Sequence, residues 1–238
     1  VDAYRLSADG THVVYVAGER ARTDHTRLFG ASLDGITAPL DLTPVGILPG
    51  LPLLISDPQI TPDGSRVLCL YRDLRTRLYS VPLQGGAGVV LSRNATVTRD
   101  VLSFRITADG LRVVYLADED TNEVFELYSL PVDGGAPAVQ LNSELPQGGD
   151  VLNGFELSPD GSRVVYRTRT SANGIDLHSA PVDGSSPSVR LSLPRPLTSV
   201  EADFRIAFDS LGVVYRADQD TNDVPELYAV RIDGASPP

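Results

Sequence analysis

Short apolar stretches, separated by turn residues, follow one another along the whole chain. The most apolar of them return at a regular interval: Val13-Val14-Tyr15, Val67-Leu68-Cys69-Leu70, Val113-Val114-Tyr115, Val164-Val165-Tyr166 and Val213-Val214-Tyr215. Consecutive apolar positions in such short runs are typical of strands that are buried on both faces. No segment has the periodicity of an amphipathic helix, so the pattern predicts an all-β protein.

Two turn motifs divide the chain into five repeats. The first is centred on residues 34, 84, 133, 183 and 233, in steps of 50, 49, 50 and 50: Leu33-Asp34-Gly35, Leu83-Gln84-Gly85, Val132-Asp133-Gly134, Val182-Asp183-Gly184 and Ile232-Asp233-Gly234. The second, Ser/Thr-x-Asp-Gly, precedes it by about half a repeat and is degenerate in the fifth copy, Ala207-Phe208-Asp209-Ser210. Both favour tight turns, because Asp bonds nearby backbone and Gly accepts positive φ. Their constant spacing indicates tandem copies of one structural unit.

Each repeat contains four apolar runs, which we number as first to fourth strand. We therefore predict a single β-propeller domain over residues 1–238, made of four-stranded antiparallel blades in repeats of about fifty residues. The approximate repeats are 1–43, 57–92, 101–142, 152–192 and 201–238, with the first strands near 3–7, 58–61, 103–107, 154–158 and 203–207. The fifth repeat lacks its outer strand, so either the last blade is three-stranded or the chain is part of a larger propeller. We favour the second interpretation.

Four tyrosines occupy the same place in the second strand of their repeats: Tyr15, Tyr115, Tyr166 and Tyr215. Blades of a propeller stack face to face, so equivalent aromatic residues meet the same neighbour in each copy. We predict that all four pack between blades.

The repeated pattern Phe-x-Ile-Ser-Pro-Asp-Gly-x-x-Val-Val-Tyr, followed by Glu-Leu-Tyr-Ser-x-Pro-Val-Asp-Gly-Gly, resembles the TolB-type, WD-like propeller repeat of bacterial periplasmic and secreted proteins. The resemblance covers essentially the whole chain. It implies a periplasmic or extracellular location in a bacterium. It does not imply one function, because such repeats occur in the Tol envelope system, in substrate-gating domains of prolyl-oligopeptidase-like enzymes and in surface binding domains.

Two loops one hundred residues apart carry the same pattern of oxygen-bearing side chains. The candidate metal ligands are Asp118, Asp120, Asn122 and Glu126 in the third repeat, and Asp218, Asp220, Asn222 and Glu226 in the fifth. Oxygens at positions 1, 3, 5 and 9, with a carbonyl at 7, suit Ca²⁺. The spacing resembles the calcium-binding hairpins of integrin-type propellers, although Glu123 and Asp223 replace the usual glycine at position 6. Turn propensity alone is the alternative explanation.

Composition narrows the possible partners and reactions. The net charge of −11 argues against a nucleic-acid partner, and no run approaches the ~18 apolar residues of a membrane-spanning helix. All 20 basic residues are arginines, so lysine Schiff-base chemistry is excluded. The sequence contains no Gly-x-Ser-x-Gly, His-Glu-x-x-His or glycine-rich phosphate motif. We predict no catalytic residues and no cofactor other than Ca²⁺.

These observations favour a non-catalytic binding scaffold of the bacterial cell envelope or exterior, with a protein or peptide partner rather than a small molecule. The binding face would be formed by the loops between second and third strands, which carry arginine in the first, second and fourth repeats: Arg20, Arg22, Arg27, Arg72, Arg75, Arg77, Arg167 and Arg169. The alternative is the substrate-gating propeller domain of a larger hydrolase of the prolyl-oligopeptidase type. Either way, the chain could associate with further blades of the same or another chain.

Overall fold

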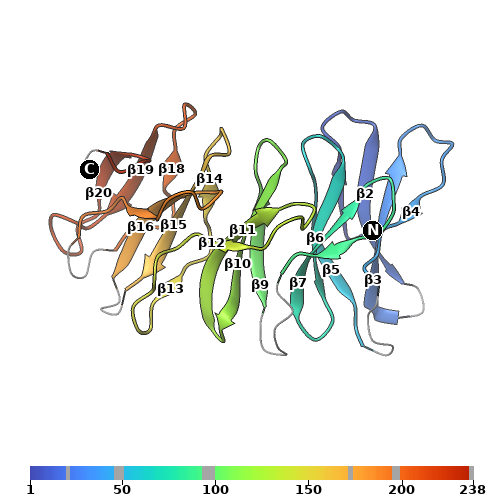
Figure 1. Cartoon of the computed structure of the whole chain (residues 1–238), viewed down its shortest axis with the longest axis horizontal. Coiled ribbons are helices and arrows are strands. Elements are labelled where there is room, and N and C mark those ends of the chain that lie inside the picture. The colour runs from blue at the N-terminus through green and yellow to red at the C-terminus, as the bar shows by residue number, and fades with distance from the viewer. Residues whose placement is uncertain (20–21, 46–50, 93–99, 171–173, 195–198, 236–238) are drawn as a thin grey trace.

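The computed structural model describes residues 1–19, 22–45, 51–92, 100–170, 174–194 and 199–235. These residues form five antiparallel sheets, each built from one repeat, and contain no helix (Figure 1). The predicted fold class is therefore confirmed. We call the sheets blades 1 to 5 in chain order.

The blades share one strand order, in which sequential neighbours are paired. Blade 1 comprises β1 (Ala3–Leu6), β2 (His12–Glu19), β3 (Arg22–Ser32) and β4 (Leu40–Asp41). Blade 2 comprises β5 (Leu54–Ile60), β6 (Arg66–Arg72), β7 (Thr76–Pro82) and β8 (Val89–Val90). Blade 3 comprises β9 (Val101–Ile106), β10 (Arg112–Thr121), β11 (Val124–Pro131) and β12 (Val139–Gln140).

Blades 4 and 5 depart slightly from this plan. Blade 4 comprises β13 (Asp150–Val151), β14 (Glu156–Leu157), β15 (Arg163–Arg169), β16 (Ile175–Pro181) and β17 (Val189–Arg190). Both β13 and β14 pair with β15, so they are two parts of one interrupted first strand. Blade 5 comprises β18 (Arg205–Ile206), β19 (Gly212–Ala217) and β20 (Glu226–Arg231). The first strands thus lie close to their predicted places, and blade 5 has three described strands.

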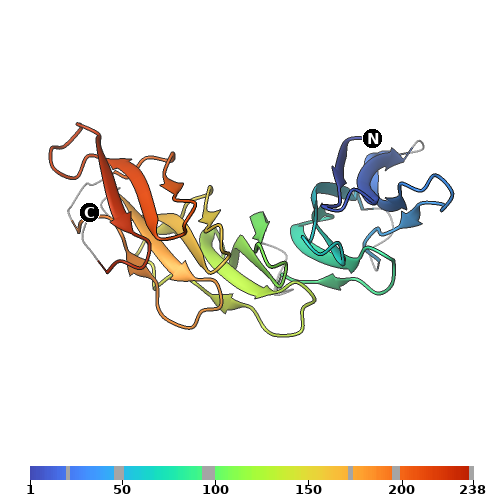
Figure 2. The ribbon, with the colours of Figure 1, turned by 90° about the horizontal axis from the view of Figure 1, so that it is seen from above.

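The five blades form an open arc, with the first strands on its concave side and the fourth strands on its convex side (Figure 2). The core lies between blades rather than within them. Each of four apolar clusters joins one blade to the next, as where Leu68 and Leu78 of blade 2 meet Phe104 and Tyr115 of blade 3. This packing explains the consecutive apolar residues of the second strands, because both faces of an inner blade are covered.

The Ser/Thr-x-Asp-Gly turns close the hairpins between first and second strands through side-chain hydrogen bonds. In blade 3 the Thr107 hydroxyl donates to Asp109 Oδ1 (2.6 Å), and the Leu111 amide donates to the same oxygen (3.0 Å). Gly110 completes the turn with φ of 73°. In blade 5 Ser210 takes the glycine position with φ of 61°, so the degenerate motif keeps the turn geometry at the expense of backbone strain.

Three of the four equivalent tyrosines lie between blades as predicted: Tyr115 and Tyr166 are completely buried, and Tyr215 is 1% exposed. Tyr15 occupies the same register position but is only half-buried. Its side chain lies on the face of blade 1 that none of the other described blades covers, so the prediction is wrong for this residue. Position in the arc, rather than residue type, decides the burial.

Candidate functional site

The hairpins between second and third strands lie at the same edge as the segments that lead from blade to blade. Backbone and side-chain hydrogen bonds join the two: Thr76 N–H donates to Asp100 Oδ1 (2.6 Å), and Phe125 N–H donates to Asp150 Oδ1 (2.7 Å). The Val200 amide likewise donates to the Ile175 carbonyl (3.0 Å). We call this edge, formed by the five hairpins and the connecting segments, the loop edge. These bonds make it a continuous surface across blades rather than a row of separate loops.

Asp118 and Asp218 hold the backbone of the two acidic hairpins through hydrogen bonds to amides. Asp118 is 3% exposed, and its carboxylate accepts hydrogen bonds from the amides of Asp100 (2.5 Å) and Glu123 (3.1 Å). Asp218 accepts in the same way from the amides of Ser199 (2.6 Å) and Asp223 (3.3 Å). The loop residue that donates has positive φ in both hairpins. The first aspartate of each motif therefore fixes a left-handed turn and attaches it to the segment that enters the blade.

A tyrosine hydroxyl brings two further carboxylates together in each hairpin. Tyr128 Oη lies 3.0 Å from Asp120 Oδ2 and 2.8 Å from Glu126 Oε2. In blade 5, Tyr228 Oη lies 3.1 Å from Asp220 Oδ2 and 3.0 Å from Glu226 Oε2.

The surroundings keep both phenols protonated. Burial, followed by the two carboxylates, raises the pKa of Tyr128 above its usual value and that of Tyr228 to about 12. The single phenol proton lies between two carboxylates, so each hairpin presents two carboxylates close to one neutral hydroxyl.

The structure thus separates the predicted ligands into two groups. The residues at positions 3 and 9 converge on the tyrosine hydroxyl, whereas those at position 1 are directed to backbone amides. The Asn222 amide donates to Asp223 Oδ2 (2.7 Å) rather than facing the carboxylate pair. Within the described residues, no three His, Cys, Asp or Glu side chains are grouped so that they could hold a metal ion. Calcium binding stays a prediction.

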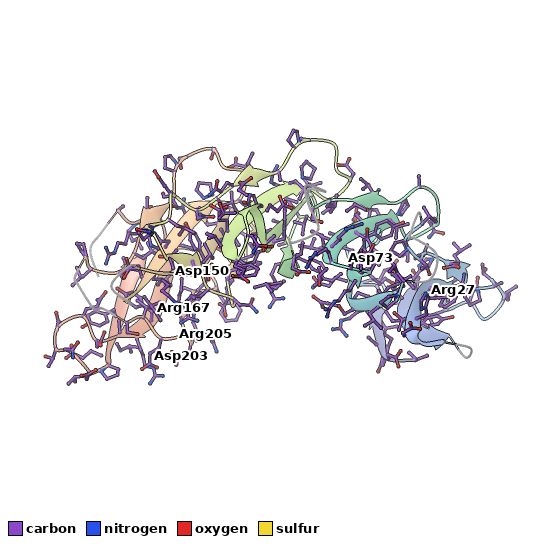
Figure 3. The ribbon with its side chains drawn as sticks, turned by 90° about the horizontal axis from the view of Figure 1, so that it is seen from below. Arg27, Asp73, Asp150, Arg167, Asp203 and Arg205 are labelled. Atoms are coloured by element: carbon purple, nitrogen blue, oxygen red, sulfur yellow. The ribbon has the colours of Figure 1, made fainter. Side chains whose placement is uncertain are left out.

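Arginines of the other hairpins pair with acids on the same edge. Arg77 lies 3.5 Å from Asp73 and stacks on the Tyr71 ring, whose centroid is 5.8 Å from the guanidinium carbon. Arg27 forms an ion pair with Asp41. Figure 3 shows Arg27, Asp73 and Arg167 spread along the arc on blades 1, 2 and 4. The loop edge therefore carries arginine-bearing hairpins on blades 1, 2 and 4 and acidic hairpins on blades 3 and 5.

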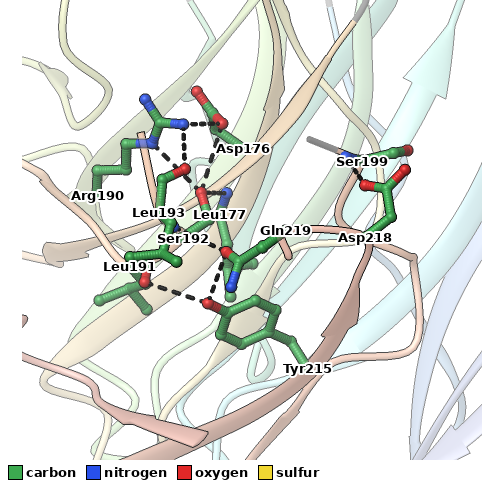
Figure 4. Close-up of polar contacts among 10 residues, drawn as sticks. All are labelled: Asp176, Leu177, Arg190, Leu191, Ser192, Leu193, Ser199, Tyr215, Asp218 and Gln219. Carbon is green, nitrogen blue, oxygen red and sulfur yellow. Dashed lines mark hydrogen bonds and ion pairs between the residues drawn. The ribbon is translucent and has the colours of Figure 1, made fainter. Parts of the chain in front are cut away.

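The junction between blades 4 and 5 is held by a polar network (Figure 4). Arg190 donates to Asp176 Oδ1 (2.6 Å) and to the Leu193 carbonyl (2.7 Å). Gln219 Oε1 accepts from the Leu193 amide (2.8 Å) and the Tyr215 hydroxyl (3.1 Å). Burial raises the pKa of Asp176, which Arg190 partly offsets. These groups bond to one another across the junction, which makes their role structural.

Two aspartates that join blades, Asp100 and Asp150, were not predicted from the sequence. A usable signal existed: each stands four or five residues before the phenylalanine of its first strand, Phe104 or Phe155. Without the fold, an acid at that place is indistinguishable from any other polar loop residue.

A groove of about 510 Å³ lies beside the acidic hairpin of blade 3. It is lined by the hairpin itself and by the segment between blades 3 and 4, including Thr121, Glu126, Asn142, Glu144 and Gly149. The groove offers mixed polar and apolar contacts next to the carboxylate pair, an arrangement suited to an extended polar ligand.

No protein-family model matches the sequence, and no curated protein matches it. The structure is similar to the protein assigned as TolB from Agrobacterium tumefaciens, with 19% identity, coverage of 98% of this chain and 78% of that one, and a TM-score of 0.51. It is also similar to dipeptidyl peptidase 4 from Porphyromonas gingivalis (11% identity, 97% and 38% coverage, TM-score 0.66). A third similar structure is oligopeptidase B from Leishmania major (8% identity, 97% and 32% coverage, TM-score 0.62).

At these identities the likeness concerns the fold alone. The chain spans less than two-fifths of the length of the two peptidases. The described part of the chain has no helix that is long and apolar enough to cross a membrane. Strand order, repeat motifs and structural neighbours agree, and the fold is that of a TolB-like β-propeller.

Proposed function

We propose that the chain is a non-catalytic binding scaffold of the bacterial cell envelope or exterior, which holds a protein or peptide at its loop edge. One observation carries the proposal: blades 3 and 5 present the same carboxylate pair, each held by a tyrosine hydroxyl. In blade 3, Glu126 of this pair lines the 510 Å³ groove. Carboxylates held in place beside a groove can accept hydrogen bonds from a peptide backbone or from basic side chains.

The distribution of arginines and acids over different hairpins of the loop edge supports an extended partner. Arginines of blades 1 and 2 flank the acidic hairpin of blade 3 on one side, and blade 4 adds Arg167 and Arg169 on the other. A partner with a complementary order of charges would be steered and kept in register by this surface. Calcium at the acidic hairpins would then stabilise the binding face rather than take part in a reaction.

A peptide library displayed on phage tests the proposal with the chain as it is. Selected peptides are synthesised and their affinities measured by fluorescence anisotropy against the parent and two variants. Asp120→Asn with Asp220→Asn removes two charges from the loop edge but keeps an acceptor for each tyrosine. Asp63→Asn with Asp109→Asn removes two charges from the opposite edge as the matched control. We expect weaker binding only for the loop-edge variant; equal affinities, or no selected peptide, would contradict the proposal.

The alternative is that the chain is the substrate-gating propeller of a larger hydrolase. The observation that favours it is the similarity to the propeller-containing peptidases, of which the chain covers about a third. The complete reading frame discriminates between the two. A downstream domain with a Gly-x-Ser-x-Gly nucleophile motif would favour the hydrolase, whereas further repeats without such a domain would favour the scaffold.

A further inference from the structure

Blade 4 differs from blades 3 and 5 at one place on the face that packs against the preceding blade. In blades 3 and 5 this place holds the same two cross-strand pairs: Tyr115 with Tyr128 and Ala117 with Glu126, and Tyr215 with Tyr228 and Ala217 with Glu226. In blade 4 the corresponding pairs are Tyr166 with His178 and Thr168 with Asp176. The third strand of blade 4 therefore carries a smaller ring and a shorter carboxylate, and its ring has no hydroxyl.

A cavity of about 130 Å³ lies over these four residues of blade 4, and all four line it. Alternate residues of a strand point to one face and directly opposite residues are neighbours, so Tyr166, Thr168, Asp176 and His178 form a single patch. Most of the remaining lining comes from residues 142–146, the segment that follows β12. A cavity of roughly 150 Å³ is sufficient to bind a benzene ring. The cavity of blade 4 therefore has the size of one aromatic ring.

Contacts to both blades hold the 142–146 segment in place. Asn142 Oδ1 accepts a hydrogen bond from the Leu127 amide of blade 3 (2.7 Å). The hydroxyls of Ser143 and Ser188 lie 2.7 Å apart, which joins the segment to blade 4 just before β17. Leu145 packs on the apolar cluster between the two blades. One wall of the cavity is therefore fixed by the junction itself.

Asp176 and His178 keep hydrogen-bonding capacity within this cavity. Asp176 is 6% exposed, and its Oδ1 accepts from Arg190 (2.6 Å) and from the Ser192 hydroxyl (3.4 Å). Its Oδ2 accepts no hydrogen bond from the described residues, and Figure 4 shows this oxygen turned away from Arg190. The His178 ring stacks on Tyr166, with centroids 5.6 Å apart. Burial, followed by Arg190, lowers the pKa of His178 to about 4, so the ring is neutral at pH 7.

The charges around the cavity favour a neutral ligand. Arg169 lines the cavity and Arg190 binds Asp176, so a cation would meet two arginines. An anion would meet the carboxylates of Asp176 and Glu144, which also line the cavity. A neutral hydrogen-bond donor suits Asp176 Oδ2 without adding a buried charge.

The chain itself shows which neutral donor fits this position. At the equivalent places of blades 3 and 5, the Tyr128 hydroxyl lies 2.8 Å from Glu126 and the Tyr228 hydroxyl lies 3.0 Å from Glu226. In both blades a phenol thus donates to the carboxylate of the third strand. The aromatic rings at the cavity of blade 4 also suit an aromatic ligand.

We propose that the blade-4 cavity binds the phenol ring of a tyrosine side chain in the peptide held at the loop edge, with the phenol hydroxyl donating to Asp176 Oδ2. The inference rests on the proposed function, and it names one side chain of the partner. The cavity and the 510 Å³ groove share four lining residues: Asn142, Glu144, Leu145 and Pro146. A peptide that lies in the groove therefore passes beside the cavity and can insert a ring into it.

Titration with p-cresol, which is the tyrosine side chain without its backbone, tests the cavity independently of any peptide. Binding to the ¹⁵N-labelled chain is followed by NMR, with toluene as the probe that lacks the hydroxyl. We expect p-cresol to shift the amide signals of Thr168, Asp176 and His178, and toluene to bind about tenfold more weakly, because it cannot donate to the carboxylate. No binding of p-cresol up to its solubility limit would overturn the proposal, and so would equal affinities for the two probes.

His178→Tyr places in blade 4 the residue that blades 3 and 5 already carry, so the variant should fold and fill its own cavity. Leu111→Tyr adds the same ring at a leucine that is 66% exposed in a turn of blade 3, and it is the matched control. We expect His178→Tyr to lose p-cresol binding and Leu111→Tyr to keep it. Unchanged binding to His178→Tyr would show that p-cresol lies elsewhere. Nuclear Overhauser contacts from p-cresol to the Thr168 and Leu145 methyl groups give the same information in the parent chain, and their absence would overturn the proposal.

The peptides selected against the parent connect the cavity to the proposed function. Replacing the tyrosine of such a peptide by phenylalanine should weaken its binding to the parent by about tenfold and leave its binding to His178→Tyr unchanged. Peptides that bind without any dependence on a tyrosine would overturn this inference and leave the proposed function standing. Binding of p-cresol in the cavity without any selected peptide would contradict the proposed function but support the phenol site.

Discussion

Truncation of equivalent tyrosines offers a direct measure of how blade stacking stabilises the chain. Tyr115→Ala removes a completely buried ring that packs on Tyr128 (centroids 5.5 Å apart) and on the aliphatic face of blade 2. Tyr15→Ala removes the same ring at the same strand position, stacked on Phe29 (5.3 Å) but covered by no blade. Comparison of the two variants separates the stability contributed by the contact within a blade from that contributed by the contact between blades.

The expected magnitudes follow from the burial. Removing roughly 200 Å² of aromatic surface from its buried place costs up to about 5 kcal/mol at 25 cal/mol/Å², and measured large-aromatic truncations in cores cost about 3–5 kcal/mol. We therefore expect Tyr115→Ala to reduce the free energy of unfolding by about 3–5 kcal/mol. The Tyr15 ring is already partly in water in the folded chain, so its removal exposes less apolar surface. We therefore expect Tyr15→Ala to reduce the free energy of unfolding by roughly half of that amount or less.

Urea unfolding followed by circular dichroism measures both values. Hydrogen exchange at the amides of blades 2 and 3 shows whether the Tyr115→Ala loss is centred on that junction. Equal losses for the two variants would refute the reasoning, since burial between blades would then contribute nothing beyond stacking on the neighbouring strand. A larger loss for Tyr15→Ala would refute the alignment of the repeats.

Three further predictions concern titration, reactivity and metal binding. Hydrogen bonds from Thr107 and from the Leu111 amide lower the pKa of Asp109. Its contribution to stability is therefore present above the unfolded pKa and is lost as the pH falls through the lower folded pKa. Asp109→Asn should make the free energy of unfolding depend less on pH below about pH 4. Burial raises the pKa of Cys69 to about 12, so Ellman's reagent should react with it only after unfolding, and rapid reaction of the native chain would contradict its place in the core. Calorimetry should give Ca²⁺ heats for the parent that Asp120→Ala with Asp220→Ala abolishes; equal heats would leave both hairpins as ordinary turns.

The sequence contained the information for the blades because each blade is specified locally. Asp109 and Gly110 form their turn from bonds within five residues, and the same local chemistry returns in the first four repeats, so the motif and its spacing predict four strands per unit. The five first strands could be placed for the same reason. The break between β13 and β14 could not, because it follows no single residue type: in blade 4 it includes Gly154, at φ of 101°, whereas blade 5 has the corresponding break between the Val200–Ala217 bridge and β18 without a glycine.

The candidate site was only partly predictable, because its geometry depends on contacts between residues that the repeat pattern treats alike. Spacing placed Asp118, Asp120 and Glu126 in one row of oxygens, yet the fold directs Asp118 to the amides of Asp100 and Glu123 and leaves the other two on a tyrosine hydroxyl. The competing donor, an amide 18 residues away, becomes a neighbour only when the blade forms. Tyr15 shows the same limit for burial: its repeat position is that of a core residue, but its exposure is set by whether another blade lies beside it. Tandem repeats therefore let sequence predict what a residue contacts within its own blade. Contacts across the blade boundary, on which the loop edge depends, require the arrangement of the whole arc.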